Sequence, residues 1–123
     1  MIECVSTQGG AIERLKRAFR ACPKDFDLMQ QEIEAGRVSV YHLTGERFNV
    51  VVAGEIVGES YFLWGLAGRG MVEAVRELRH YVEKAGLSSI SADTHFKGVA
   101  KLCRALGIDE SQCDGVTSMK WEF

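Results

Sequence analysis

The chain has 123 residues and a mass of 13.6 kDa, a size that predicts one domain spanning residues 1–123. Apolar residues make up 46% of the sequence and charged residues 26%, and these ordinary globular values exclude wholesale disorder. The formal net charge of −2 argues against a dedicated nucleic-acid-binding protein, because such proteins usually carry a strong basic excess.

The sequence predicts a cytoplasmic protein without a membrane span or a metal site. No apolar run approaches the ~18 residues that a span requires, and the first residues lack the basic and apolar segments of a signal peptide. The four cysteines are expected to be free thiols, because no secretion signal is present. No spacing of cysteine and histidine suits zinc.

The first third of the chain predicts one strand and two helices. A short β-branched run predicts a strand over 2–6, at the edge of a sheet or as its first strand. After the break at Gly9-Gly10, apolar residues at helical spacing predict a helix that ends before Pro23. A second helix is expected to begin near Asp25, a good N-cap, and to end at Gly36.

The middle of the chain predicts an antiparallel meander. Strands are expected over 37–43, 48–53 and 56–64. Turns at Thr44-Gly45 and Gly54-Glu55 would join them, and such short turns pair consecutive strands antiparallel.

The last part of the chain predicts a helix over 72–85, a strand over 88–92, a helix from Thr94 to Gly107 and a strand over 116–123. The order is β-α-α-β-β-β-α-β-α-β. The fold class is therefore mixed α/β, with a mostly antiparallel sheet that is locally parallel at one strand–helix–strand crossover and is flanked by helices.

One short motif carries chemistry. Gly68-Arg69-Gly70 joins a predicted strand directly to a predicted helix. Glycines let the backbone approach a ligand, and the helix start offers unpaired N–H groups and the positive end of the dipole. Together they favour a phosphate or pyrophosphate. The alternative is a tight turn that only exposes an arginine.

The sequence around this motif resembles the GCN5-related N-acetyltransferase (GNAT) superfamily, in which a Q/R-x-x-G-x-G/A stretch joins the fourth strand to the third helix and cradles the pyrophosphate of coenzyme A. Here that stretch is 65–70, with Gly65 in place of Gln or Arg. The segment 99–108 is similar to the family's A-x-x-L-Y-x-x-x-G-F, with Cys103 in place of Tyr. The likeness covers about residues 50–108. The chain is short, and in this respect it resembles the short GNAT-like proteins of tailed phages.

The resemblance implies acetyl transfer from acetyl-CoA to an amine, carried by a small molecule or a protein. Pantetheine would lie between the splayed strands 61–64 and 88–92. The implied coenzyme A contacts are Leu63, Trp64, Leu66, Ala67, Gly68, Arg69, Gly70, Met71, Lys97 and Lys101. The two lysines share a basic helix face with Arg104. The alternative interpretation is that this face is only solvated.

The implied catalytic residues are Glu59 as the base and Cys103 as the acid, with Glu55 and His42 as further candidates for the base. Cys103 also lies on an apolar stripe, which fits a small buried side chain. The departures at Gly65 and Cys103 favour an alternative, a GNAT-like binding or structural protein without turnover.

Three further points stay open in the sequence. Arg14, Lys16 and Arg17 on the first helix either are solvated or select an acidic acceptor. Trp121 and Phe123 belong to the core or to a homodimer contact. A phage-encoded protein would lie in the host cytoplasm or the virion.

Overall fold

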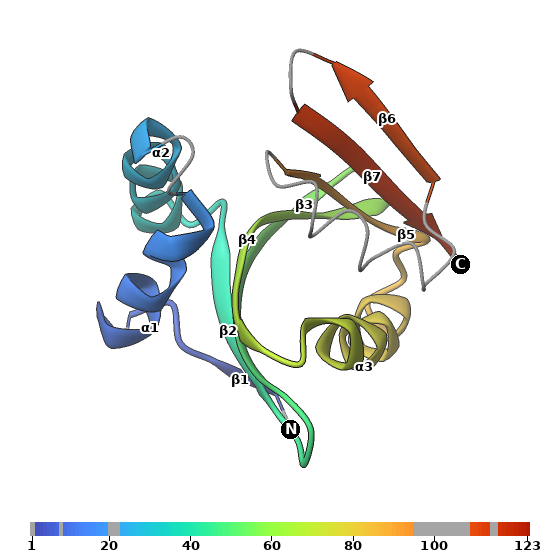
Figure 1. Cartoon of the computed structure of the whole chain (residues 1–123), viewed down its shortest axis with the longest axis horizontal. Helices are drawn as coiled ribbons and strands as arrows, with labels where there is room; N and C mark the ends of the chain where they lie inside the picture. Colours follow the sequence, from blue (N-terminus) through green and yellow to red (C-terminus); the bar gives the residue numbers. More distant parts are fainter. Residues whose placement is uncertain (1, 8, 20–22, 95–108, 114–115) are drawn as a thin grey trace.

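The computed structural model describes residues 2–7, 9–19, 23–94, 109–113 and 116–123. A curved mixed sheet forms its centre, with helices α1 and α2 on one face and α3 on the other (Figure 1). In chain order the elements are β1 (Ile2–Cys4), α1 (Gly9–Arg14), the 3-10 helix η1 (Leu15–Phe19), α2 (Pro23–Glu34), β2 (Ser39–Thr44), β3 (Asn49–Val57), β4 (Ser60–Arg69), α3 (Met71–Lys84), β5 (Ser89–Thr94), β6 (Asp109–Cys113) and β7 (Val116–Glu122).

The described strands form one sheet in the order β1-β2-β3-β4-β5-β7-β6. Strands β4 and β5 pair in parallel, and the other neighbours pair antiparallel. Helix α3 makes the crossover between β4 and β5, which confirms the predicted parallel pair. The mixed α/β class with a mostly antiparallel sheet is likewise confirmed. No helix in the described ranges is both long and apolar enough to cross a membrane.

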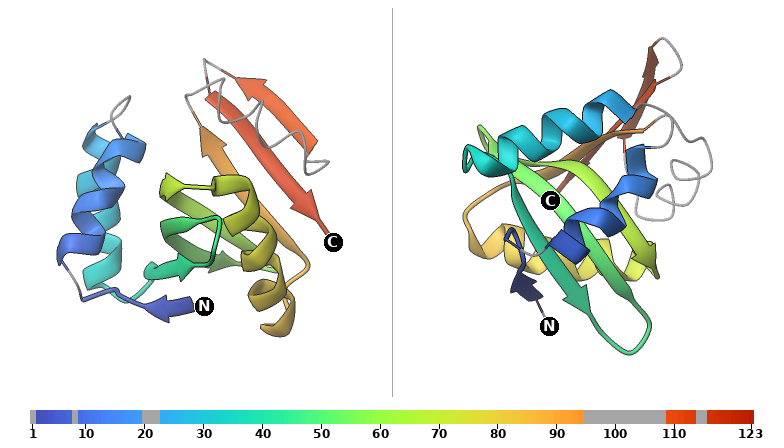
Figure 2. Two further views of the ribbon diagram at one scale, coloured as in Figure 1. Left: turned by 60° about the horizontal axis from the view of Figure 1, so that its bottom comes forward. Right: turned by 90° about the vertical axis from the view of Figure 1, so that its left-hand side faces the viewer.

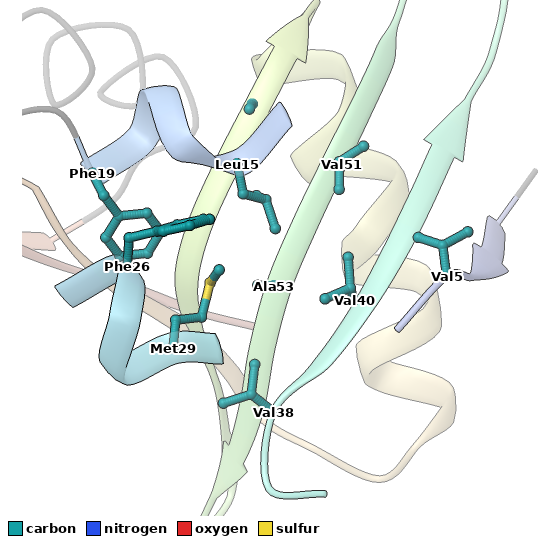
Figure 3. Close-up of a cluster of buried hydrophobic side chains, with 10 residues drawn as sticks. Val5, Leu15, Phe19, Phe26, Met29, Val38, Val40, Val51 and Ala53 are labelled. Atoms are coloured by element: carbon teal, nitrogen blue, oxygen red, sulfur yellow. The ribbon is translucent and has the colours of Figure 1, made fainter. Parts of the chain in front are cut away.

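Two buried clusters hold the helices to the sheet. The α1–α2 cluster fills the space between these helices and strands β2, β3 and β4 (Figure 3). Its buried members are Val5, Leu15, Phe19, Phe26, Met29, Val38, Val40, Val51, Ala53 and Ala67. The α3 cluster lies on the opposite face, and its buried members are Leu43, Val52, Tyr61, Leu63, Val75, Leu78, Val82, Ile90 and Trp121.

The N-terminal helices differ from their prediction in detail. Gly9 and Gly10 lie inside α1, and the chain continues as the 3-10 helix η1 rather than as one helix up to Pro23. Leu15 and Phe19 are buried as the apolar spacing predicts. Helix α2 starts at Pro23, before the expected Asp25, because proline suits the first position of a helix. Figure 2 shows α1 and α2 packed side by side, away from α3.

The predicted turn at Gly54-Glu55 is wrong, because β3 continues through both residues to Val57. The hairpin turn is at Gly58-Glu59, where Gly58 has a φ of +62°. Gly54 is needed for packing instead: a Cβ there would lie 2.4 Å from the ring of Tyr61.

Strand β4 is longer than predicted. The expected strand ended at Trp64, but residues up to Arg69 pair with β3. The predicted loop over 65–70 is therefore mostly strand, and the turn is confined to its last residues.

The C-terminal part adds a strand that was not predicted. Strand β6 pairs with β7 as an antiparallel hairpin, so the sheet has one strand more than the predicted order. The segment 109–113 is polar and gives no strand signal. Strand β7 confirms its predicted alternation, with Met119 and Trp121 buried and Lys120 exposed. The predicted helix from Thr94 to Gly107 falls on residues 95–108, outside the described residues.

Candidate functional site

Strand β4 is paired on both sides only along its first half. Strand β5 pairs with it from Ser60 to Leu63, and within the described residues this pairing ends at Leu63 and Ala92. Strand β3 continues beside β4 as far as Arg69. The backbone from Trp64 to Arg69 therefore has an edge toward β5 that carries no described strand partner.

The strands separate later than the resemblance implied. Residues 61–64 and 88–92 were expected to be splayed, but Tyr61–Leu63 pair with Ile90–Ala92 as regular parallel strands. The divergence begins one residue further on, at Trp64.

Trp64 occupies the point of divergence because β4 carries a bulge there. The register between β3 and β4 shifts between Ala53 and Gly54, and Trp64 is the residue left without a partner on β3. A bulge bends its strand and re-aims side chains. Trp64 packs against the α1–α2 cluster, so its indole lies on the face of the sheet opposite α3.

The indole of Trp64 is fixed by two neighbours. Its N–H donates a hydrogen bond to Oε1 of Glu55 across 2.9 Å. The ring of Phe62 meets it edge to face, with centroids 6.4 Å apart and planes at 87°. All three side chains are half-buried, so they line an accessible surface beside the divergence.

The turn that ends β4 requires both of its glycines. Gly68 has a φ of +137°, and a Cβ there would lie 2.1 Å from the backbone oxygen of Asn49. Gly70 has a φ of +71°, and a Cβ there would lie 2.2 Å from the backbone oxygen of Arg47. Positive φ values are strained for other residues. The turn is exposed, and so is Arg69 between the two glycines.

Helix α3 begins directly after this turn. Gly70 is its N-cap in the left-handed conformation, and no side chain caps the helix. The first intrahelical bond runs from the N–H of Ala74 to the oxygen of Gly70. The N–H groups of Met71, Val72 and Glu73 therefore have no acceptor within the helix. Together with the dipole and Arg69, they form a place suited to an anion.

A hydrogen-bonded group backs the turn on the α1–α2 face. Arg14 Nη2 donates to Asn49 Oδ1 at 3.0 Å, and His42 Nε2 lies 2.8 Å from the same oxygen. Since arginine can only donate, the shared atom is the amide oxygen, and His42 must donate from Nε2. A neutral His42 would therefore accept a proton only at Nδ1. The backbone of Asn49 is also what closes the space beside Gly68.

The carboxylates proposed as the base are placed differently from one another. Glu59 is exposed in the β3–β4 turn, five residues before Trp64 along an extended strand, or roughly 16 Å. Glu55 lies on β3 directly opposite Phe62. Exposed Asp93 follows Ala92, the last β5 residue paired with β4, so the structure brings two carboxylates to the divergence. His42 lies on β2, at the end of the sheet where α3 begins.

The other residues predicted to bind coenzyme A flank the divergence. Leu63 and Leu66 pack in or against the α3 cluster, and Ala67 is buried in the α1–α2 cluster. Met71 is the first residue of α3. Cys103, Lys97 and Lys101 lie outside the described residues, as does Arg104.

Sequence reasoning missed two members of this region. Asn49 begins a β-branched run and has no motif around it, yet it holds Arg14 and His42 together. The sequence predicts Phe62 only as a strand residue. The period of a strand does place Phe62 and Trp64 on one face, and this signal could have found the pair.

Comparison with known proteins identifies the fold. A scan against protein-family models and a search of curated protein sequences found no match. Among solved structures, a Bacillus subtilis acetyltransferase in complex with CoA superposes with a TM-score of 0.73 at 13% identity, over 99% of this chain and 97% of that one.

Two further structures agree with the first. The ribosomal-protein-S18-alanine N-acetyltransferase of Escherichia coli gives a TM-score of 0.62 at 17% identity, over 98% of this chain and 90% of that one. The PaiA N-acetyltransferase of Thermoplasma acidophilum in complex with coenzyme A gives 0.62 at 9% identity, over 100% and 99%. The chain therefore has the fold of the GCN5-related N-acetyltransferase superfamily.

Proposed function

We propose that the protein is an acyl-CoA-dependent N-acyltransferase that moves an acetyl group from acetyl-CoA to an amine. The observation that carries the proposal is the junction at the end of β4. Beginning at Trp64, the β5 side of β4 has no strand partner among the described residues, and β4 leads into an exposed glycine turn at the start of α3, whose N-cap Gly70 makes no side-chain cap hydrogen bond. Structural neighbours solved in complex with coenzyme A support the use of this substrate.

The residues at this junction fit the parts of coenzyme A. The diphosphate would lie against Gly68, Gly70 and the first N–H groups of α3, with Arg69 adding a charged contact. The amides of pantetheine would pair with the free edge of β4 between Trp64 and Ala67. The positive φ values of the two glycines turn the chain sharply into α3, and this turn leaves its polar backbone groups at the surface.

Acetyl-CoA supplies an acyl group on a thioester. In the transfer, the amine nitrogen forms a bond to the carbonyl carbon and the carbon–sulfur bond breaks. One proton leaves the nitrogen, and one proton reaches the sulfur of coenzyme A. Backbone N–H groups near Trp64 would stabilise the charge that develops on the carbonyl oxygen. Glu59 as the base and Cys103 as the acid stay predictions.

Calorimetric titration with acetyl-CoA and then with CoA tests the binding step. We expect saturable binding by the wild type and a loss of about tenfold in affinity for Arg69→Glu, since a charge-assisted contact contributes about 1.5–3 kcal/mol. Lys84→Glu is the matched control: it reverses an exposed charge at the other end of α3, and its affinity should equal that of the wild type.

Release of the free thiol in the presence of amines tests the transfer step. Thiol release that depends on both the amine and the glycine turn supports an enzyme. Binding without release across a broad amine panel would favour the binding protein instead, and absence of binding would overturn the proposal. A cytoplasmic location, an amine acceptor on a small molecule or a protein, and a homodimer complete the proposal as expectations from sequence.

A further inference from the structure

Three side chains form a defined surface on the α1–α2 face at the divergence of β4 and β5. Glu55 and Phe62 are direct cross-strand partners on β3 and β4. Trp64 lies two residues after Phe62 on the same face of β4, and it contacts both. We call Glu55, Phe62 and Trp64 the aromatic–carboxylate site. It lies beside the residue at which the free strand edge begins.

The carboxylate of this site is only partly engaged. Oε1 of Glu55 accepts the indole N–H of Trp64. Among the described residues no ion pair or second hydrogen bond to Glu55 is found. An ionised carboxylate has about four lone-pair positions in all, so Oε2 remains able to accept hydrogen bonds from a ligand.

Arg37, a described cation whose charge interacts with Glu55, is paired with Glu32. Its Nη2 donates to Glu32 Oε1 at 3.1 Å, and its Nε donates to the other oxygen of the same carboxylate. Glu32 is the main cause of the raised pKa of Arg37, and Glu55 adds a smaller contribution of the same sign. The hydrogen bonds of the Arg37 guanidinium therefore go to Glu32 and leave the carboxylate of Glu55 without an ion pair to Arg37.

Two cations on α1 and η1 already have partners. Arg14 is engaged by Asn49, and Lys16 pairs with Glu13 at 3.3 Å. An acidic acceptor would therefore meet, at Arg14 and Lys16, cations that are already paired. A positively charged acceptor would meet a carboxylate with a free oxygen.

The chemistry of this site suits an ammonium group on an apolar body. Indole and phenyl faces attract cations, and tryptophan does so most strongly. A carboxylate accepts charge-assisted hydrogen bonds from the same cation. A carboxylate on the ligand next to its amine would be repelled by Glu55.

We propose that the aromatic–carboxylate site selects the acceptor of the acyltransferase: a primary amine that binds as a cation, carries an apolar or aromatic body and has no carboxylate beside the amine. The inference rests on the proposed N-acyltransferase function. The role given to Glu55, Phe62 and Trp64 is recognition of the acceptor.

The experiment compares two acceptors that differ only in that carboxylate, phenethylamine and L-phenylalanine. Their kcat/KM values are measured by release of the CoA thiol at saturating acetyl-CoA, and their binding is measured by calorimetry in the presence of CoA. We expect phenethylamine to be preferred by at least about tenfold in both measurements.

Variants then assign the preference to the site. Glu55→Gln should raise the KM for phenethylamine by about tenfold and shrink the preference, with the Kd for acetyl-CoA unchanged. Trp64→Phe keeps a ring but removes the donor, and a smaller loss is expected. Glu3→Gln, an exposed carboxylate on edge strand β1, removes the same charge far from β4 and should behave as the wild type.

The outcomes separate the two proposals. Equal use of L-phenylalanine and phenethylamine, or an unchanged preference in Glu55→Gln, would overturn the acceptor inference while acetyl transfer itself stands. If acetyl-CoA binds but no amine releases thiol, the proposed function fails, and the calorimetric preference still decides whether the site disfavours a ligand with a carboxylate beside its amine.

Discussion

Glycines have different roles beside the two halves of strand β4. In the closed half, between β3 and β5, the ring of Tyr61 fills the space where Gly54 has no side chain. In the open half, the space beside Gly68 and Gly70 is filled by backbone oxygens of the β2–β3 region. Gly54 is buried, whereas the later two glycines are exposed.

This difference shows that Gly54 is required for side-chain packing, whereas Gly68 and Gly70 are required for the path of the backbone. A side chain that fills the place of a missing Cβ can move or be replaced, so Gly54 serves the density of the core. A backbone oxygen cannot move without shifting a strand, and a positive φ adds strain for any other residue. The glycines of the open half therefore fix a sharp turn that leaves polar backbone groups at the surface.

The largest effect is expected from Gly68→Ala. The new Cβ would meet the Asn49 oxygen at 2.1 Å and would adopt a φ of +137°. Backbone strain and overpacking each cost about 1–3 kcal/mol, so the free energy of unfolding should fall by about 2–6 kcal/mol. Urea denaturation followed by circular dichroism measures this loss.

Gly58→Ala is the control for strain alone. Gly58 has a φ of +62°, but nothing lies within 4 Å of the position of its Cβ. It should lose only about 1 kcal/mol. Equal losses in the two variants would show that contact with β3 does not distinguish the open half.

A smaller effect is expected from Gly54→Ala in the closed half. The methyl group would displace the ring of Tyr61, and overpacking of this kind costs about 1–3 kcal/mol. In a Tyr61→Leu background the same change should cost much less, because the ring is gone. A double-mutant cycle by urea denaturation measures this coupling. A cycle with no coupling would mean that Gly54 is required for its backbone and not for the ring.

Elements with a strong period could be predicted from the sequence. Helix α3 was expected over 72–85 and is observed over Met71–Lys84, because Val75, Leu78 and Val82 repeat at helical spacing and are buried together. The parallel pairing of β4 with β5 followed from this helix, since a strand–helix–strand crossover has one favoured arrangement.

The hairpin and the C-terminal pair could not be predicted in the same way. Gly54 next to a charged residue is typical of a turn. In the structure the strand continues through Gly54, and the ring of Tyr61 fills the space that a side chain at Gly54 would occupy. Segment 109–113 forms β6 by pairing with β7, although its side chains are almost all polar. Packing and pairing across neighbouring strands decide both cases, and the composition of the segment itself does not reveal them.

The candidate site shows the same division. The glycine turn was predicted because its residues are adjacent in the sequence. The contact between Trp64 and Glu55 depends on a register shift across two strands, and the hydrogen bonds of Asn49 join three elements. A single sequence carries no record of cross-strand register, so these partners could be found only in the structure.

The smallest effect concerns the hydroxyl of Tyr61. It is buried and has no hydrogen-bond partner among the described residues, so Tyr61→Phe should raise the free energy of unfolding by about 1 kcal/mol while leaving the ring over Gly54. Burial also raises the pKa of this phenol above its ordinary value of about 10.

The raised pKa gives the stability a pH dependence of known sign. Below pH 10 or so the phenol is neutral in both states, and above it the unfolded chain loses a proton that the folded chain keeps. The wild type should therefore lose stability as the pH rises above about 10, and Tyr61→Phe should lose less. Urea denaturation at neutral and alkaline pH compares the two proteins. Parallel declines would mean that Tyr61 ionises as readily in the folded chain as in the unfolded one, and that the closed half of β4 is less tightly packed than its burial indicates.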